Sequence, residues 1–289
     1  MSNINDYRID DETKFQLNKL KTDDSGKIKS KEEAEELLLK NTLEMTELHD
    51  KLYAQDKYAI LIIFQAMDTA GKDGAIKHVM SGLNPQGTKV HSFKKPSAEE
   101  LNHDYLWRAN LHLPERGMIG IFNRSYYEEV LVVRVHNLIK SQQIPPEFIT
   151  DKIWEKRFRQ IRDYETYLFE NGIIPIKFYL HLSKGEQKKR LLARIDNKEK
   201  NWKFSEADIQ ERAFWDKYHD CNEEMIRGTS TKKAPWYIIP ADNKWYARLL
   251  ISKIIIKRLE KLELAYPTLD EEKTKNLEVF KAKLLGEKD

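Results

Sequence analysis

Two residues of a short turn, Gly71 and Lys72, are of the types that bind phosphate. They lie in the stretch MDTAGKDG, residues 67–74, between an apolar run and a segment with helical character. The common phosphate-loop pattern G-x-x-x-x-G-K-[ST] would place glycine at Ala66 and serine or threonine at Asp73. A strand that ends in such a turn and feeds a helix directs backbone N–H groups and the helix dipole at one point. The turn therefore predicts a phosphate site.

Each residue of the turn has an expected role. Gly71 permits the turn, Lys72 reaches terminal phosphate oxygens, and Gly74 lets the helix begin close to the ligand. Besides Lys72, the predicted phosphate-binding residues of this segment are Ala70, Gly71, Asp73 and Gly74. The alternative is an ordinary strand-to-helix turn in which Lys72 is solvated.

Asp68 is the candidate metal ligand of the turn. In the common pattern a hydroxyl after the lysine holds magnesium, but Asp73 occupies that position here, so the ion needs other ligands. Hard cations prefer oxygen ligands, and the Asp68 carboxylate is the nearest in the sequence. We therefore expect Mg²⁺ as the cofactor, held by Asp68 directly or through water.

A second set of polar residues follows another apolar segment. Residues 117–122 read as a strand and end in Asn123-Arg124-Ser125. In open α/β sheets ligands gather at the carboxyl ends of the strands, so Arg124 is expected to face the phosphates and to neutralise a phosphoryl group in transfer. The alternative is a surface arginine paired with Glu128 or Glu129.

Apolar strand-like runs alternate with helical segments along the chain. Strands are expected at residues 58–64, 88–93, 117–122, 173–182 and 236–239. Helices are expected at residues 31–53, 98–111, 150–170, 184–195, 207–226 and 245–264. This alternation predicts an α/β fold, a parallel sheet in a three-layer sandwich. We expect a polar, partly disordered N-terminal extension at 1–30, a catalytic domain at 31–266 and a peripheral C-terminal tail at 267–289.

Composition excludes several classes of protein. The chain of 289 residues carries 50 Lys plus Arg against 47 Asp plus Glu, so its net charge of +3 gives no general attraction to nucleic acid. Its longest apolar runs are too short to cross a bilayer, and no secretory leader is expected. Cys221 is the single cysteine, and the sequence has no Cys/His metal-ligand spacing. We expect a protein of the reducing cytoplasm with no nucleic-acid or membrane partner.

Five motifs together resemble the polyphosphate kinase 2 family. They are MDTAGKDGAIKHV, SFKKPSAEELNHDYLWR, GIFNRSYYEEVLVVRVH, NWKFS and PWYIIPADNKWYARL, spread over residues 30–265. The resemblance implies a P-loop kinase fold similar to thymidylate kinase, with a mobile helical lid at about residues 184–226. It also implies reversible, magnesium-dependent phosphoryl transfer between inorganic polyphosphate and a nucleotide. The family normally has glycine where this chain has Ala66, a change of one methyl unless a positive φ is required.

The second motif bears on the nucleotide substrate. Some family members, chiefly those that act on nucleoside diphosphates, have Asp-Arg-Ser where this chain has Asn123-Arg124-Ser125, and Asn where it has Glu128. The variant here is similar to the third class, which phosphorylates AMP and ADP to ADP and ATP; guanine nucleotides are further candidates. Glu128 would then supply a nucleotide-binding carboxylate, or it is a surface residue stabilised by a helix dipole.

The resemblance also suggests roles for cations further along the chain. Arg190 and Arg194 share a helix face that would close over the phosphates as part of the lid, with Lys203 near the nucleotide; the alternative is a solvated charged helix. A long polyanion is expected to pass Lys77, Lys94, Lys95 and Arg134, and Trp202 is expected to pack beside the lid. The predicted catalytic residues are Asp68, Lys72, Asn123, Arg124 and Arg194.

Two alternative functions remain open at this level. One is an ATP-dependent nucleoside monophosphate kinase, which would use the same loop, magnesium and lid. The other is a non-catalytic nucleotide- or polyanion-binding module, which predicts loss of Asp68, Lys72 or Arg124, although all three are present. The resemblance and the Leu-rich amphipathic helices suggest a homodimer or homotetramer.

Overall fold

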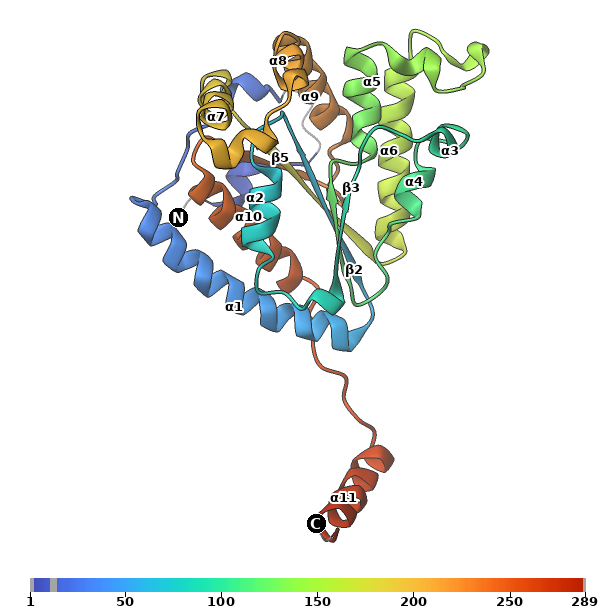
Figure 1. The fold of residues 1–289 in the computed structure, drawn as a ribbon. Coiled ribbons are helices and arrows are strands. Elements are labelled where there is room, and N and C mark those ends of the chain that lie inside the picture. Colours follow the sequence, from blue (N-terminus) through green and yellow to red (C-terminus); the bar gives the residue numbers. More distant parts are fainter. Residues whose placement is uncertain (1–2, 11–14, 288–289) are drawn as a thin grey trace.

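A six-stranded sheet forms the centre of the protein (Figure 1). The computed structural model describes residues 3–10 and 15–287. The strand order is β1-β6-β5-β2-β4-β3, and the pairs from β6 to β3 are all parallel. The strands are β1 Arg8–Ile9, β2 Ala59–Ala66, β3 Thr88–Ser92, β4 Ile119–Asn123, β5 Ile173–His181 and β6 Trp236–Pro240. The predicted α/β class with a mostly parallel sheet is confirmed.

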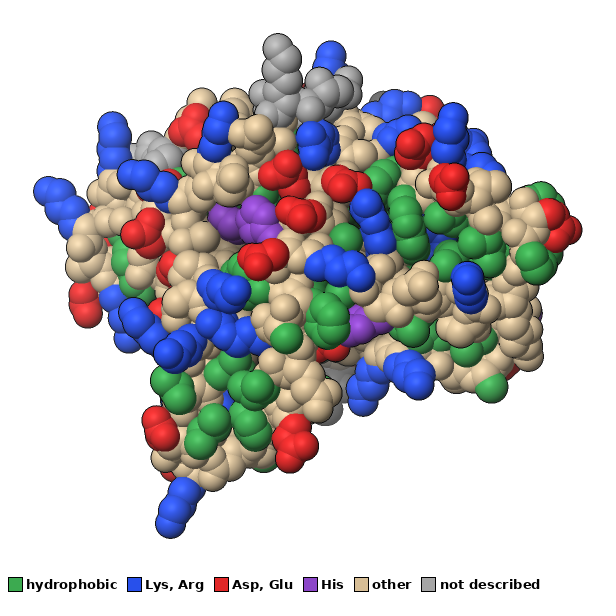
Figure 2. Space-filling model, turned by 90° about the horizontal axis from the view of Figure 1, so that it is seen from above, with side chains coloured by type: hydrophobic (Ala, Val, Ile, Leu, Met, Phe, Trp, Pro, Cys, Tyr) green, Lys and Arg blue, Asp and Glu red, His purple; other side chains and the backbone are tan. Residues whose placement is uncertain are grey.

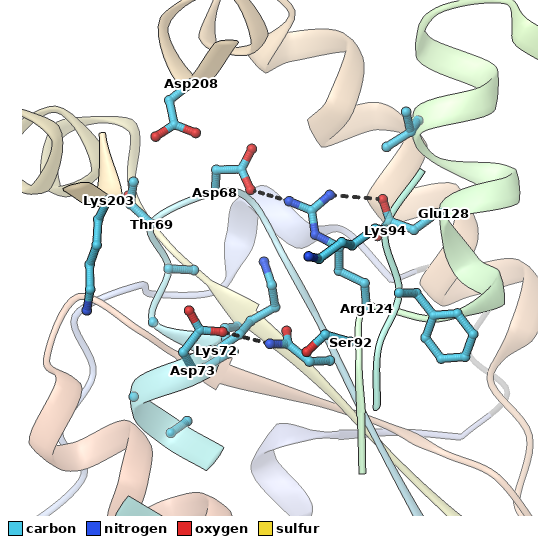
Figure 3. A pocket seen from close by; sticks show the side chains of 18 of the residues that line it. Asp68, Thr69, Lys72, Asp73, Ser92, Lys94, Arg124, Glu128, Lys203 and Asp208 are labelled. Atoms are coloured by element: carbon cyan, nitrogen blue, oxygen red, sulfur yellow. Dashed lines mark hydrogen bonds and ion pairs between the residues drawn. The ribbon is translucent and has the colours of Figure 1, made fainter. Parts of the chain in front are cut away.

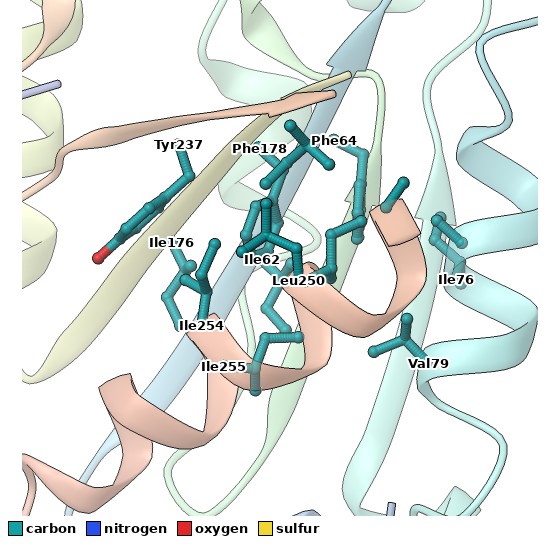
Figure 4. Packing of buried hydrophobic residues seen from close by; sticks show 14 of the residues in the cluster. Ile62, Phe64, Ile76, Val79, Ile176, Phe178, Tyr237, Leu250, Ile254 and Ile255 are labelled. Atoms are coloured by element: carbon teal, nitrogen blue, oxygen red, sulfur yellow. The ribbon is translucent and has the colours of Figure 1, made fainter. Parts of the chain in front are cut away.

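The central strand β2 is buried on both faces, because its run of apolar and mostly β-branched residues meets helices on either side. On one face Ile62 and Phe64 pack with Leu250 and Ile254 of α10 (Figure 4). On the other face, the residues that alternate with them along β2 join a second core cluster with residues of α6 and α9. The sheet is therefore the middle of three layers.

The helices of the described residues have the following bounds. The α-helices are α1 Lys31–Gln55, α2 Lys72–Val79, α3 Ala98–Leu101, α4 Trp107–Asn110, α5 Val132–Val135, α6 Ile153–Glu170, α7 Lys184–Asp196, α8 Glu206–Arg212, α9 Trp215–Thr229, α10 Lys244–Glu260 and α11 Glu271–Leu285. The 3-10 helices are η1 Ile4–Tyr7, η2 Leu17–Lys19, η3 Pro85–Gly87, η4 Tyr126–Val130, η5 Leu138–Ser141, η6 Pro146–Phe148 and η7 Lys198–Lys203. The helix predictions at 31–53, 150–170, 184–195 and 245–264 are confirmed, with ends shifted by a few residues.

Two predicted helices are each divided in the structure. The segment 98–111 forms α3 and α4, because the Asp104 carboxylate accepts a hydrogen bond from the Leu106 N–H, 2.9 Å away, and turns the chain between them. The segment 207–226 forms α8 and α9. Its chain changes direction at residues 213–214, which places Trp215 and Tyr218 in buried positions while α8 stays at the surface.

The prediction of a merely peripheral N-terminal extension is wrong for much of its described part. β1 pairs antiparallel with β6, and Tyr7, Ile9 and Leu17 are buried. A two-residue strand is too short to produce a recognisable alternation, so sequence periodicity misses it. Residues 1–2 and 11–14, within the expected disordered segment, lie outside the described residues. At the other end α11 is exposed and stands apart from the sheet and its helices (Figure 1). Within the described ranges, no helix has the length and hydrophobicity that a bilayer crossing requires.

Candidate active site

A cavity of about 1290 Å³ lies at the carboxyl ends of β2, β3 and β4 (Figure 3). Residues of the β2–α2 loop, of the segment after β3, and of α7, α8 and α10 line it. Fifteen of the sixteen predicted site residues are among its lining: Asp68, Ala70, Gly71, Lys72, Asp73, Gly74, Lys77, Lys94, Lys95, Asn123, Arg124, Glu128, Arg190, Arg194 and Lys203. The topology therefore brings residues that are distant in the sequence to one cavity.

The β2–α2 loop takes the conformation that its glycine allows. Gly71 has φ +107° and is the N-cap of α2, so a side chain there would be strained. Ala66 pairs with Leu180 as the last residue of β2 and is not a positive-φ residue. The alanine methyl is therefore compatible with the backbone, which removes the question raised by the missing glycine. Thr69 has φ +66°, an unfavourable value for a β-branched residue.

Lys72 is buried, and its ammonium group is hydrogen-bonded to an uncharged acceptor. Its ammonium donates a hydrogen bond to the Ala66 carbonyl, 3.1 Å from Nζ. Burial lowers the pKa of Lys72, and the positive charge of Arg124 lowers it further. The ammonium lines the cavity while bound to a carbonyl oxygen, which an anionic phosphate oxygen can replace.

Arg124 joins two carboxylates across the site (Figure 3). Its guanidinium lies 2.7 Å from Asp68 Oδ1 and 3.4 Å from Glu128 Oε2. Glu128, and then Asp68, raise the pKa of Arg124, so the side chain stays charged. Its φ of +62° and the hydrogen bond from its N–H to the Phe64 carbonyl turn the chain sharply where β4 ends. Arg124 therefore lines the cavity, as predicted, and also pairs with Glu128, as the alternative interpretation predicted.

Asn123 contacts the start of α2. Its side-chain amide donates to Asp73 Oδ1 at 2.6 Å, which links the end of β4 to the first turn of the helix. A serine or threonine at position 73 would have a shorter side chain. The carboxylate found there instead reaches the neighbouring strand and fixes the two motifs relative to each other.

Sequence reasoning missed a second carboxylate, Asp208 of α8. It lines the cavity near Asp68 (Figure 3). Its carboxylate pairs with Arg194 at 2.8 Å. Burial raises the pKa of Asp208, and the negative charge of Asp68 adds to this effect. Nothing in the local pattern of α8 marks this residue, since only the folded chain brings it to the loop. Among the described residues, no group of three or more His, Cys, Asp or Glu side chains is arranged to hold a metal.

Sequence reasoning also missed cations on α10. Lys244 and Arg248 are four residues apart, line the cavity, and form no ion pair within the described part of the chain. Burial lowers the pKa of Lys244, as does the nearby charge of Arg190. Their i, i+4 spacing inside one of the five motifs was the available signal. The space-filling view of Figure 2 shows basic and acidic side chains interspersed on that face of the molecule. In the lining of the cavity, by contrast, Lys and Arg side chains outnumber Asp and Glu side chains.

Two sequence predictions fail in the structure. Arg134 is absent from the described lining of the cavity, because its guanidinium pairs with Glu224 at 2.7 Å and lies over the Trp154 ring. The four-residue helix α5 directs it toward α9, so we withdraw its phosphate-binding assignment. Trp202, expected to pack beside the lid, is 78% exposed.

Comparisons with known proteins place the chain among nucleotide phosphotransferases that use polyphosphate. It is 50% identical over 281 residues to the ADP-polyphosphate phosphotransferase of Rhodopseudomonas palustris, covering 96% of this chain and 97% of that protein. It is 43% identical over 262 residues to the AMP/ADP-polyphosphate phosphotransferase of Meiothermus ruber, covering 90% and 94% respectively.

A solved structure and a family model agree with these relatives. The crystal structure of polyphosphate kinase 2 from Arthrobacter aurescens TC1 superposes with a TM-score of 0.85 at 38% identity, covering 94% of this chain and 95% of that one. The model of the family described as Polyphosphate kinase 2 matches residues 28–266. The chain therefore belongs to the polyphosphate kinase 2 family.

Proposed function

We propose that the protein transfers phosphoryl groups reversibly between inorganic polyphosphate and adenine nucleotides, converting AMP to ADP and ADP to ATP. The observation that carries this proposal is the convergence of Lys72, Arg124 and several cations that form no ion pair with any described residue on one cavity beside the β2–α2 loop. The activities for which the two relatives are named support the same donor and acceptors.

The strand–loop–helix unit of residues 66–79 is proposed to act as a P-loop. An oxygen of the acceptor's terminal phosphate attacks the terminal phosphorus of polyphosphate. The bond from that phosphorus to the bridging oxygen breaks, and the bridging oxygen leaves with the electron pair on a chain one phosphate shorter. Lys72 and Arg124 stabilise the negative charge on the oxygens of the group in transfer, which is the main requirement of this chemistry.

Asp68 and Asp208 are suited to hold Mg²⁺. Magnesium binds proteins through one or two carboxylates while keeping waters and substrate phosphates as its other ligands, so a larger protein cluster is unnecessary. When bound, it would neutralise charge on the phosphates. Asp68→Asn should lower activity, and added Mg²⁺ should partly restore it; an unchanged Mg²⁺ dependence would assign Asp68 to stabilising the turn instead.

The C-terminal helix supports the proposal of a homo-oligomer. Leu277, Phe280 and Leu284 lie on one face of α11 at helical spacing and are exposed. An isolated helix of this length is marginal in water, so we propose that this face packs on a second copy of the chain. Light scattering should give a dimer or tetramer for the full chain and a smaller species for a chain ending at residue 266. A monomeric full chain at micromolar concentration would contradict this.

The cellular setting follows from the substrates. We place the enzyme in the cytoplasm, where adenine nucleotides are abundant, and the buried free thiol of Cys221 is consistent with a reducing compartment.

Comparing phosphoryl donors tests the proposed function. The purified protein is given AMP, ADP, GMP or GDP with Mg²⁺ and either long-chain polyphosphate or ATP as donor. We expect polyphosphate to support ADP formation from AMP and ATP formation from ADP, with Lys72→Ala reduced by orders of magnitude. Transfer to AMP from ATP, with none from polyphosphate, would instead identify an ATP-dependent monophosphate kinase.

A further inference from the structure

Helix α7 holds three successive carbonyl groups of the β2–α2 loop. The side-chain amide of Gln187 donates to the Asp68 carbonyl at 3.1 Å. Arg190 Nη1 donates to the Thr69 carbonyl at 3.2 Å and to the Ala70 carbonyl at 2.9 Å. One helix face therefore fixes the orientation of consecutive peptide groups in the loop that lines the cavity.

The remaining donors of Arg190 are also occupied. Its Nε donates to Glu186 Oε1 at 2.9 Å, and its Nη2 donates to the carbonyls of Ala241 and Asp242 at 2.7 and 3.0 Å. A guanidinium has five N–H donors, and each has a partner here. Arg190 is 8% exposed, so a phosphate could bind it only by displacing one of these acceptors, four of which are backbone carbonyls. The predicted phosphate-binding role of Arg190 is therefore not supported by its contacts.

The loop needs such external support. Thr69 has φ +66°, a conformation that is unfavourable for a β-branched residue unless its surroundings impose it. Its hydroxyl oxygen is buried without a hydrogen-bond partner within the described structure. The local sequence therefore does not favour this geometry, and the contacts from α7 supply the constraint.

The direction of the carbonyls also sets the direction of the amides. In a trans peptide the N–H of the next residue points opposite to the carbonyl. With the Asp68 and Ala70 carbonyls directed at α7, the N–H groups of Thr69 and Gly71 point away from it. The Ala70 N–H closes the turn to the Met67 carbonyl at 3.3 Å. Both residues with outward amides line the cavity.

We propose that Arg190 and Gln187 are positioning residues, which hold the phosphate loop in its anion-binding conformation without contacting the substrate. This inference rests on the proposed function. It divides the expected lid: α7 up to Arg190 is a fixed support of the loop, and any closing motion belongs to the segment that follows. That segment begins at Asn197, the residue in extended conformation that follows α7, and continues through η7 and α8.

The test separates the shape of the guanidinium from its charge. Arg190→Lys retains the positive charge but loses the planar arrangement of five N–H donors, and Arg190→Met loses both. Gln187→Ala loses one uncharged hydrogen bond. Lys189→Met, on the exposed side of the same helix, is the matched control. We expect both Arg190 variants to reduce kcat by about 100-fold, because small displacements of a catalytic loop have effects of that size. We expect about 10-fold for Gln187→Ala, and for the control no change.

Hydrogen exchange supplies a readout independent of catalysis. Without substrate, the peptide covering residues 66–73 should exchange faster in the Arg190 and Gln187 variants than in the parent and the control, while the sheet peptides stay protected. Near-parental kcat in Arg190→Lys, with a raised KM for polyphosphate in Arg190→Met, would overturn the proposal in favour of direct phosphate contact. Unchanged loop exchange in Gln187→Ala, the mildest variant, would also overturn it. Because exchange requires no reaction, failure of the proposed function would leave this result interpretable.

Discussion

Replacing Gly71 by alanine tests the backbone on which the site depends. The structure gives Gly71 a φ of +107° at the N-cap of α2, and an added Cβ would meet its nearest contact, Arg190 Nη1, at an ordinary 3.9 Å. Space is therefore available, and the cost of alanine arises from the backbone conformation. The matched change Gly74→Ala lies inside α2, where the added Cβ would lie 3.6 Å from Arg248 Nη2 and φ is not positive.

The two substitutions should change stability in opposite directions. At Gly71 the left-handed conformation costs an alanine roughly 1–2 kcal/mol, and the less flexible unfolded chain offsets about 0.4–1 kcal/mol of this. The net loss is on the order of 1 kcal/mol. At Gly74 the helical conformation suits alanine, so stability should rise by about 0.5–1 kcal/mol. For a chain of this size each kcal/mol moves Tm by roughly 2–4 °C.

Thermal unfolding and steady-state kinetics together check this prediction. Gly71→Ala should lower Tm by a few degrees and reduce kcat about 100-fold, because the loop amides and Lys72 move from their positions. Gly74→Ala should raise Tm. If the two variants shift Tm equally and in the same direction, the positive φ at Gly71 and the role assigned to the turn are both wrong.

Other predictions follow from the charges at the cavity. Since burial and Arg124 lower the pKa of Lys72, kcat/KM for polyphosphate should fall as the pH rises through a value below that of a free lysine ammonium; a pH–rate profile of Lys72→Arg should lack this decline, and an identical decline would assign it to another group. Removing the charges of Lys94 and Lys95 together should raise KM for long polyphosphate more than for AMP or ADP, most strongly at low salt. Equal effects on donor and acceptor, measured at two ionic strengths, would reject that path for the chain. Arg134→Ala should leave both KM values unchanged, because its side chain pairs with Glu224; a raised KM would restore its predicted role.

The β2–α2 turn and the end of β4 could be predicted because their signals are local. A continuous apolar run marks a strand buried on both faces, and Gly71-Lys72 follows it directly. Asn123 and Arg124 follow a second such run. Parallel strands have their carboxyl ends at the same edge of a sheet. These two segments are therefore expected to lie close together, whatever the rest of the fold is.

The residues that were missed or misassigned depend on packing between distant segments. Asp208 lines the same cavity as Asp68 because the predicted helix at 207–226 is divided into α8 and α9. The sequence of this segment does not indicate how α8 is oriented. Arg190 was recognised as a cation near the phosphates. Its hydrogen bonds to backbone carbonyls could not be predicted, because they depend on how α7 packs against the β2–α2 loop and the β6–α10 connection. Arg134 was misplaced because a four-residue helix has no periodicity from which to assign a buried face.

Phosphorus NMR of the reaction tests the central claim most directly. The purified protein is mixed with ADP, Mg²⁺ and long-chain polyphosphate, and no other phosphoryl donor is present. The γ-phosphate signal of ATP should grow as polyphosphate is consumed, with one ATP formed for each chain phosphate lost and none formed by Lys72→Ala. ATP formation without polyphosphate consumption, or loss of polyphosphate to free orthophosphate without ATP, would contradict phosphoryl transfer from polyphosphate to ADP.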